Sequence, residues 1–159
     1  MTILEDTRQQ VGKHLKKHEF FQAANIAVCR CKVPWGDYAP VPPVSIDTKA
    51  SMDEIAANIG GKEHRRFVSE CKAAKAAGCK LFILVENELG ITDLSQVHKW
   101  INPRAVYSPN CIQGPRLQRA METISKNYGV TFLFCSPEES GKIIMKILGA
   151  YDYERKQIT

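Results

Sequence analysis

The hydrophobic and polar positions of this 159-residue chain follow strand-like patterns in some segments and a helical pattern in others. The segment 26–33 alternates, with Cys29, Cys31 and Val33 facing one way and Arg30 and Lys32 the other, which is typical of a half-buried strand. Residues 80–87 are apolar almost throughout, as expected of a strand that is covered on both faces. Residues 115–128 instead place their apolar side chains in one stripe at helical spacing. The pattern therefore predicts both strands and helices.

These elements are expected to alternate along the whole chain. Strands are predicted at 2–6, 26–33, 44–49, 80–87 and 130–136. Helices are predicted at 12–25, 51–59, 62–77, 93–101, 115–128 and 137–148. The alternation indicates an α/β fold in which helices flank a mixed central sheet. Residues 1–150 are predicted to form one domain and residues 151–159 a loose C-terminal tail.

Composition and charge limit the classes of protein to which this chain can belong. The net charge of +5 permits a polyanionic partner without requiring one. No cationic start with an apolar run and cleavage site is present, and no apolar run is long enough to span a membrane. The six cysteines are scattered and form no CxxC pair, and no histidine lies at ligand spacing from Cys29 and Cys31. These features predict a cytoplasmic protein with reduced thiols.

The stretch GDYAPVPPVSIDTK, residues 36–49, holds the strongest candidate chemistry. Strand alternation places Asp47 and Lys49 on one face, and Asp37 can join them if the intervening residues loop back. Two carboxylates at one point repel each other, and a bound Mg²⁺ removes that conflict because it prefers hard oxygen ligands. From spacing alone, a solvated hairpin with an ordinary salt bridge is the favoured interpretation.

Four segments, which follow one another in order, resemble a known family: ILEDTRQQ, VPWGDYA, IDTKASMDEIAANI and CKLFILVEN. Asp6-Thr7-Arg8, Gly36-Asp37, and Asp47-Thr48-Lys49 followed by Asp53 match the pattern of XPF-type nucleases. These nucleases belong to the PD-(D/E)XK, restriction-endonuclease-like superfamily. The segments CKLFILVEN and GPRLQRAMETISKNYGVTFLFCSPEESGKIIMKIL extend the similarity over nearly the whole chain. The resemblance implies the restriction-endonuclease-like fold, in a compact stand-alone form of the kind found in prokaryotes or their phages.

The resemblance also implies roles for individual residues. Asp37 and Asp47 match the metal ligands, and the carbonyl of Thr48 is a possible third ligand. Lys49 matches the catalytic lysine, and Asp6 matches an auxiliary acid near the metal. Thr48 stands where the family has arginine, which removes a cation from the motif. Asp53 either belongs to the site or serves the dipole of the helix that it begins.

Basic helix faces are the candidate nucleic-acid surface. The predicted nucleic-acid ligands are Arg8, Arg65, Arg66 and Lys72. The helix at 115–128 offers a second basic face, and either face is also consistent with ordinary solvated surface. Arg8 either pairs with Asp6 or meets phosphate. Trp35 either stacks on an unpaired base or belongs to the core.

The sequence thus predicts a Mg²⁺-dependent DNA endonuclease, with Mn²⁺ as a possible substitute cation. By resemblance the substrate is flap, fork or junction DNA in repair or recombination, and the protein is a homodimer with no membrane partner. The first alternative is a catalytically silent DNA-binding or scaffold subunit with the same fold. The second is a sequence-specific restriction-type nuclease.

Overall fold

The computed structural model describes residues 1–12 and 15–156, with side chains through residue 149. Contacts divide the chain into two compact units, and each is described by itself. Unit 1 comprises Met1–Pro43 with Ala77–Cys79, and unit 2 comprises Val44–Ala76 with Lys80–Thr159. The main boundary falls at the end of the Pro-Val-Pro-Pro stretch, where the proline rings restrict the backbone and remove N–H donors.

Unit 1 is a small three-stranded sheet with one helix. Its elements are β1 (Thr2–Asp6), α1 (Leu15–Ala23), β2 (Ala27–Cys31) and β3 (Tyr38–Pro40). The strand order is β2-β1-β3, with β1 parallel to β2 and antiparallel to β3. The sequence predicted β1 and β2 correctly but not the short strand β3. Helix α1 is shorter than the predicted 12–25, and residues 13 and 14 lie outside the described part.

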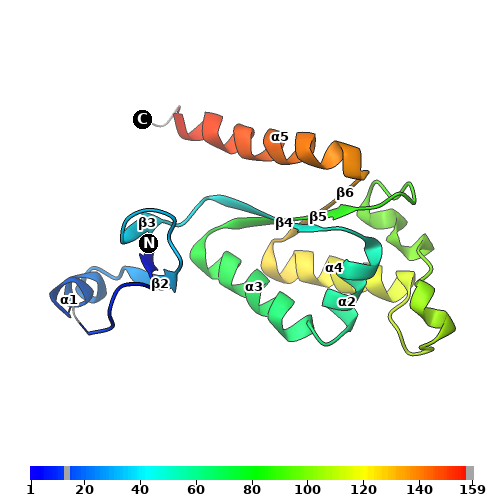
Figure 1. Cartoon of the computed structure of the whole chain (residues 1–159), viewed down its shortest axis with the longest axis horizontal. Coiled ribbons are helices and arrows are strands. Elements are labelled where there is room, and N and C mark those ends of the chain that lie inside the picture. The colour runs from blue at the N-terminus through cyan, green and yellow to red at the C-terminus, as the bar shows by residue number, and fades with distance from the viewer. Residues whose placement is uncertain (13–14, 157–159) are drawn as a thin grey trace. The chain divides into compact units, whose positions relative to one another are not determined.

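Unit 2 alternates strands and helices around a second sheet (Figure 1). Its elements are β4 (Val44–Lys49), α2 (Met52–Gly60), α3 (His64–Ala77), β5 (Lys80–Glu86), the 3-10 helices η1 (Leu94–Lys99) and η2 (Pro103–Val106), α4 (Gly114–Tyr128), β6 (Thr131–Cys135) and α5 (Pro137–Lys156). The three strands are parallel in the order β4-β5-β6. Helix α5 continues through residues 151–156, where the sequence predicted a loose tail, and residues 157–159 lie outside the described part.

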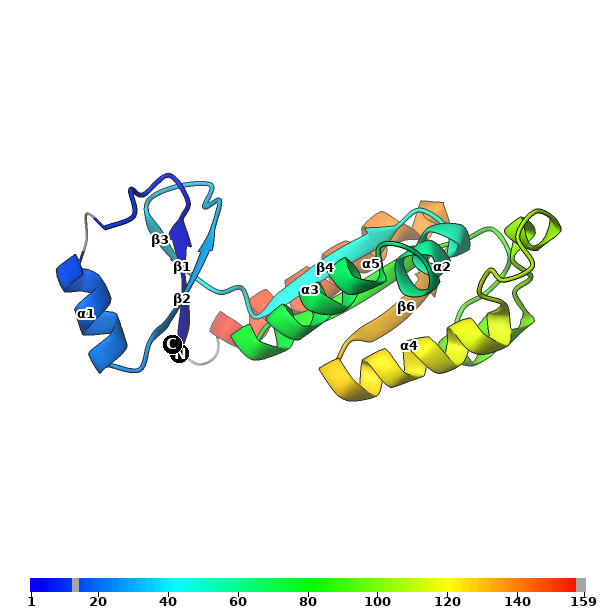
Figure 2. The same ribbon diagram turned by 90° about the horizontal axis from the view of Figure 1, so that it is seen from below.

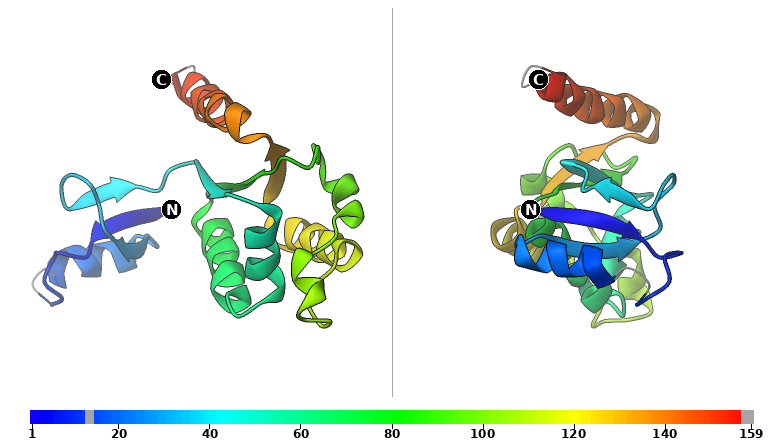
Figure 3. Two further views of the ribbon diagram at one scale, coloured as in Figure 1. Left: turned by 45° about the vertical axis from the view of Figure 1, so that its right-hand side comes forward. Right: turned by 90° about the vertical axis from the view of Figure 1, so that its left-hand side faces the viewer.

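Helices cover both faces of the second sheet. Helices α2, α3 and α4 lie on one face and α5 on the other (Figures 1 and 3). On β5, Ile83 and Val85 join the apolar cluster with α2, α3 and α4, whereas Leu84 is buried on the opposite face. This arrangement confirms the predicted doubly covered strand. It also confirms the α/β class, although the strands are divided between two three-stranded sheets rather than gathered in one.

Local capping interactions define two of the helix ends in unit 2. Ser51 Oγ caps α2 by accepting a hydrogen bond from the Glu54 N–H at 3.1 Å. Gly129 ends α4 with a φ of 69°, a left-handed conformation that glycine adopts without strain. Within the described residues, no helix is long and apolar enough to cross a membrane.

Candidate active site

The centre of the candidate site is a carboxylate and an ammonium on the edge strand β4. The register pairs Asp47 with Ile83 and Lys49 with Val85, so both side chains emerge on the face covered by α2, α3 and α4. This confirms the prediction that they share one face. The Lys49 Nζ lies 2.8 Å from Asp47 Oδ2, and Lys49 is only 7% exposed.

The Lys49 ammonium is held from several sides. It lies 5.8 Å from the centre of the Phe67 ring, within the range of a cation–π contact. It also lies 4.0 Å from Glu54 Oε1, while Glu54 Oε2 accepts a hydrogen bond from the Ala50 N–H at 2.8 Å. Sequence reasoning placed Glu54 only in the first turn of α2 and did not connect it with Lys49. The signal was the S-x-x-E spacing of a capping box, which brings a glutamate back over the residues before a helix.

The Asp47 carboxylate keeps an oxygen without a hydrogen bond. Oδ2 is buried and accepts none within the described residues, because its approach to Lys49 lacks hydrogen-bond geometry. A buried carboxylate oxygen in this state has a lone pair available for a further cation. Asp47 also helps to raise the pKa of Arg66, although the main cause of that rise is the hydrogen bond from Arg66 to Glu63.

Asp6 in unit 1 is engaged in a different way. Its Oδ1 accepts hydrogen bonds from the backbone N–H and the Nε of Arg8, both at 2.7 Å. Its Oδ2 accepts from Arg8 Nη2 and from the Val33 N–H, both at 2.8 Å. The Arg8 side-chain hydrogen bond, opposed by burial, holds the pKa of Asp6 well below its usual range. Of the two roles open to Arg8, pairing with Asp6 is therefore the one observed.

Asp37 lies on the exposed segment that Asp6 helps to hold. The Asp6 N–H donates to the Asp37 carbonyl at 2.9 Å, so the end of β1 fixes the backbone that carries this carboxylate. The Asp37 charge contributes to raising the pKa of Arg8, after the larger contributions of Asp6. Asp37 belongs to unit 1 and Asp47 to unit 2, and their predicted convergence on one ion remains a prediction. Within the described residues, no three His, Cys, Asp or Glu side chains gather as a metal-binding group.

The residues predicted to bind nucleic acid differ in whether their side chains already form an ion pair. Arg66 is exposed but donates from Nε to Glu63 at 2.7 Å. Arg65 and Lys72 are exposed and form no ion pair within the described residues. Trp35 is 87% exposed, so the core alternative for this residue is wrong. Asp53 lies in the first turn of α2, and its buried Oδ1 has no hydrogen-bond partner within the described residues.

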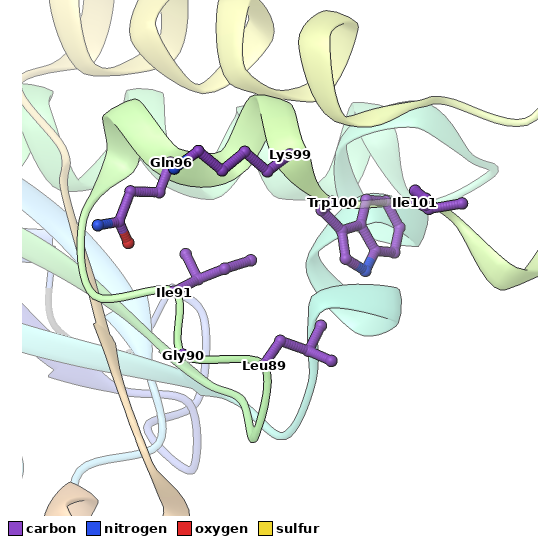
Figure 4. Close-up of a pocket in the computed structure, with 7 residues that line it drawn as sticks. All are labelled: Leu89, Gly90, Ile91, Gln96, Lys99, Trp100 and Ile101. Carbon is purple, nitrogen blue, oxygen red and sulfur yellow. The ribbon is translucent and has the colours of Figure 1, made fainter.

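Sequence reasoning missed a hollow beside η1. A cavity of about 510 Å³ is lined by the apolar side chains of Leu89, Ile91, Trp100 and Ile101 with Gln96 and Lys99 (Figure 4). Asn87 shapes the preceding turn, because its Oδ1 accepts from the Leu89 and Ile91 N–H groups, each at 3.1 Å. The polar turn ENELG after the strand was the available signal, but the cavity is formed only once residues 96–101 fold back over that turn.

A comparison with protein families matches residues 5–147 to the ERCC4 domain. The chain belongs to the ERCC4 domain family. This is a family of nuclease domains, typically metal-dependent endonucleases, and the predicted family membership is confirmed. No curated protein matches the chain in sequence.

Solved structures of an archaeal protein are similar to this ERCC4 domain. For XPF from Aeropyrum pernix the TM-score is 0.48 at 15% identity, with 98% of this chain and 66% of that chain covered. For XPF from Aeropyrum pernix in complex with DNA the TM-score is 0.44 at 15% identity, with 97% and 66% covered. The ERCC4 domain thus spans just under two-thirds of the archaeal chain in each case.

Proposed function

We propose that this ERCC4 domain is a Mg²⁺-dependent DNA endonuclease that hydrolyses phosphodiester bonds. The observation that supports it most is the Asp47–Lys49 pair, in which the carboxylate keeps a buried oxygen without a hydrogen bond. Asp47 would hold the cation together with Asp37, whose exposed carboxylate belongs to the preceding Gly-Asp motif of the family. Both offer the hard oxygens that Mg²⁺ prefers, and Mn²⁺ would bind to the same donors.

The metal's contribution is to neutralise phosphate charge and to lower the pKa of a bound water. The chain's own residues supply the rest. As an edge strand, β4 has backbone groups unpaired within its sheet, and the Thr48 carbonyl is our proposed third ligand. Lys49 would place its ammonium on the negative charge that develops at the phosphodiester, a position that Phe67 and Asp47 preorganise.

Asp6 acts in this proposal through position rather than through contact with the metal. Its oxygens are engaged by Arg8 and Val33, and its N–H fixes the Asp37 carbonyl. We therefore propose that the backbone N–H of Asp6, rather than its carboxylate, positions Asp37. Arg65, Arg66 and Lys72 on α3 would neutralise phosphates beside the catalytic strand.

Cleavage of a panel of labelled DNAs tests the proposal. Flap, fork, Holliday-junction and linear duplexes are incubated with Mg²⁺, with Mn²⁺, and with EDTA. We expect metal-dependent cutting that prefers branched substrates, consistent with a role in repair or recombination. Cutting of one linear sequence alone would instead identify a restriction-type nuclease, and no cutting of any DNA in either metal would contradict the proposal.

One observation favours a second candidate function. Thr48 stands where the family motif has arginine, which removes a cation from the catalytic strand. A catalytically silent DNA-binding or scaffold subunit does not require that cation. DNA binding that persists in EDTA, together with no cleavage in Mg²⁺, would support this second function.

We also propose that the domain forms a homodimer through its C-terminal half. Met145 on α5 is 69% exposed and Leu148 is exposed beside it, one helical turn along. An apolar helix face of this kind loses its contact with water in a symmetric dimer. Sedimentation velocity should give the dimer mass, and Met145→Glu with Leu148→Glu should give the monomer.

A further inference from the structure

A groove between α3 and α4 carries cations that the proposed catalytic site does not use. The two helices lie side by side on the same face of the second sheet (Figures 1 and 2). The cavity between them, about 380 Å³, is lined among others by His64, Val68, Arg116, Arg119, Asn127 and Tyr128. No carboxylate belongs to this lining. The α3–α4 groove is therefore positively charged.

Both arginines have unused donors. Arg116 and Arg119 are exposed, and their side chains form no ion pair or hydrogen bond within the described residues. By contrast, the Arg8 and Arg66 guanidinium groups are engaged by Asp6 and Glu63. A guanidinium presents several N–H groups in a plane that fits phosphate oxygens. Being three residues apart on α4, the two arginines project from nearly the same side of the helix.

The two helices are tied together at one end of the groove, and a lining side chain is fixed at the other end. Lys75 of α3 donates from Nζ to the Asn127 carbonyl of α4 at 2.8 Å, which ties the helices together near their C-termini. At the other end, His64 Nδ1 lies 2.7 Å from the Ile59 carbonyl, which fixes the ring at the start of α3. Because the walls are tied, little ordering is required when a ligand enters.

The lining combines cations with an aromatic ring. Tyr128 is half-buried against the core and lines the α3–α4 groove along with the apolar Val68. Sites that hold single-stranded nucleic acid combine a positive groove for the backbone with aromatic side chains for the bases. We propose that the α3–α4 groove binds one strand of nucleic acid, with Arg116 and Arg119 on phosphates and Tyr128 under a base.

This inference adds a single-strand binding site to the proposed endonuclease, and its role in cleavage rests on that proposed function. Within unit 2, Arg66 of α3 acts electrostatically on Asp47, whereas Val68 lines the α3–α4 groove. Residues two apart on a helix point in nearly opposite directions, so α3 separates the Asp47 face from the groove. A branched DNA can place its scissile strand on one side of α3 and an unpaired strand on the other.

Binding to a fluorescein-labelled single-stranded oligonucleotide, followed by anisotropy in EDTA, tests the inference without cleavage. The variant is Arg116→Glu with Arg119→Glu, both in the first turns of α4, where acids suit the helix dipole. The matched control is Lys142→Glu with Lys146→Glu, which makes the same charge change on exposed residues of α5, on the other face of the sheet (Figure 1). Circular dichroism confirms that each variant is folded.

We expect the arginine variant to weaken single-strand binding at least about thirtyfold more than the control does. The slope of log affinity against log salt should fall by about 1.4, corresponding to two phosphates on a single strand. Tyr128→Leu, which keeps an apolar side chain against the core, should weaken binding about five- to a hundredfold, the range for one stacked base.

Three results would overturn the inference. Equal losses in the arginine variant and the control would show a general charge effect. Equal losses for single-stranded and duplex oligonucleotides would show a duplex backbone site, and unchanged binding by Tyr128→Leu would remove the base contact. The nuclease proposal fails separately, since a protein that binds the strand in EDTA but cuts nothing in Mg²⁺ retains this groove function.

Discussion

Asp6 in unit 1 and Asp47 in unit 2 each lie two residues before a cation in the sequence, yet their carboxylates are used differently. Asp6 is 1% exposed, and both of its oxygens accept hydrogen bonds from Arg8 and Val33. Asp47 forms an ion pair with the Lys49 ammonium, and its buried Oδ2 accepts no hydrogen bond within the described residues. A satisfied carboxylate stabilises a fold, whereas one with a spare lone pair remains available for a ligand.

The surroundings of the two pairs explain the difference. Unit 2 is held together by a large apolar cluster formed by α2, α3, α4 and the sheet. In unit 1 the buried side chains include the charged Glu5 and Asp6, and Val33 is the buried apolar residue beside them. Glu5 meets His18 at 2.7 Å and Arg30 at 3.1 Å. Unit 1 is therefore fixed by buried polar contacts to a degree that unit 2 is not.

The largest expected effect is on catalysis through the unit 2 pair. Lys49→Ala should lower the DNA cleavage rate by at least about a hundredfold, the scale for losing one group that stabilises transition-state charge. Asp47→Asn should abolish cutting to a similar degree. Labelled-DNA cleavage in Mg²⁺ measures both, with melting curves as the control for folding. Wild-type cleavage rates in either variant would contradict the role of this pair.

A core substitution should show how strongly the stability of unit 2 depends on its apolar cluster. Ile83→Ala removes a fully buried side chain from the cluster of unit 2 and should cost about 2–5 kcal/mol of unfolding free energy. Urea denaturation followed by circular dichroism measures this loss. Ile101→Ala is the matched control, because Ile101 is exposed and should change stability little. Equal losses in the two variants would mean that Ile83 is not part of a packed core.

Asp6→Asn should destabilise unit 1 and alter its response to acid. The pKa of Asp6 is lowered in the folded protein, so its stabilisation is complete above the ordinary aspartate pKa of about 3.9 and is lost as the pH falls further. At pH 7 the variant should melt on the order of 5 °C lower than wild type. Below about pH 4 the difference should shrink. A pH-independent difference would show that the carboxylate charge is not the stabilising feature.

The smallest expected effect concerns thiol chemistry. Burial raises the pKa of the Cys71 thiol in unit 2 to about 11, so this thiol should react slowly with a disulfide reagent at pH 8. Cys29 in unit 1 is exposed and should react quickly. Mass spectrometry after timed labelling distinguishes them. Labelling of Cys71 as fast as that of Cys29 in the native protein would show that unit 2 opens readily.

The elements of unit 2 were predictable because apolar periodicity defines them. The apolar stripe on 115–128 predicts a helix, and α4 lies there. The apolar run at 80–87 predicts a doubly covered strand, and β5 lies there. In unit 1 the signal was weaker. Strand β3 has three residues and ends at Pro40, and the exposed Trp35 resembles a core residue in sequence alone.

Part of the candidate site could also be predicted. Strand alternation was sufficient to place Asp47 and Lys49 on one face. Local sequence could not show that Arg8 closes on Asp6 rather than on phosphate, because this contact depends on Val33, far along the chain. For the same reason the α3–α4 groove was not predicted, since its lining comes from helices separated by strand β5.

Metal binding tests the central claim most directly. Isothermal titration with Mn²⁺ compares wild type with Asp37→Asn, Asp47→Asn and Asp6→Asn, the last being the satisfied carboxylate and the matched control. We predict that the first two variants each lose at least about tenfold in affinity, whereas Asp6→Asn stays within about threefold of wild type. Undiminished Mn²⁺ affinity in Asp47→Asn would contradict the account.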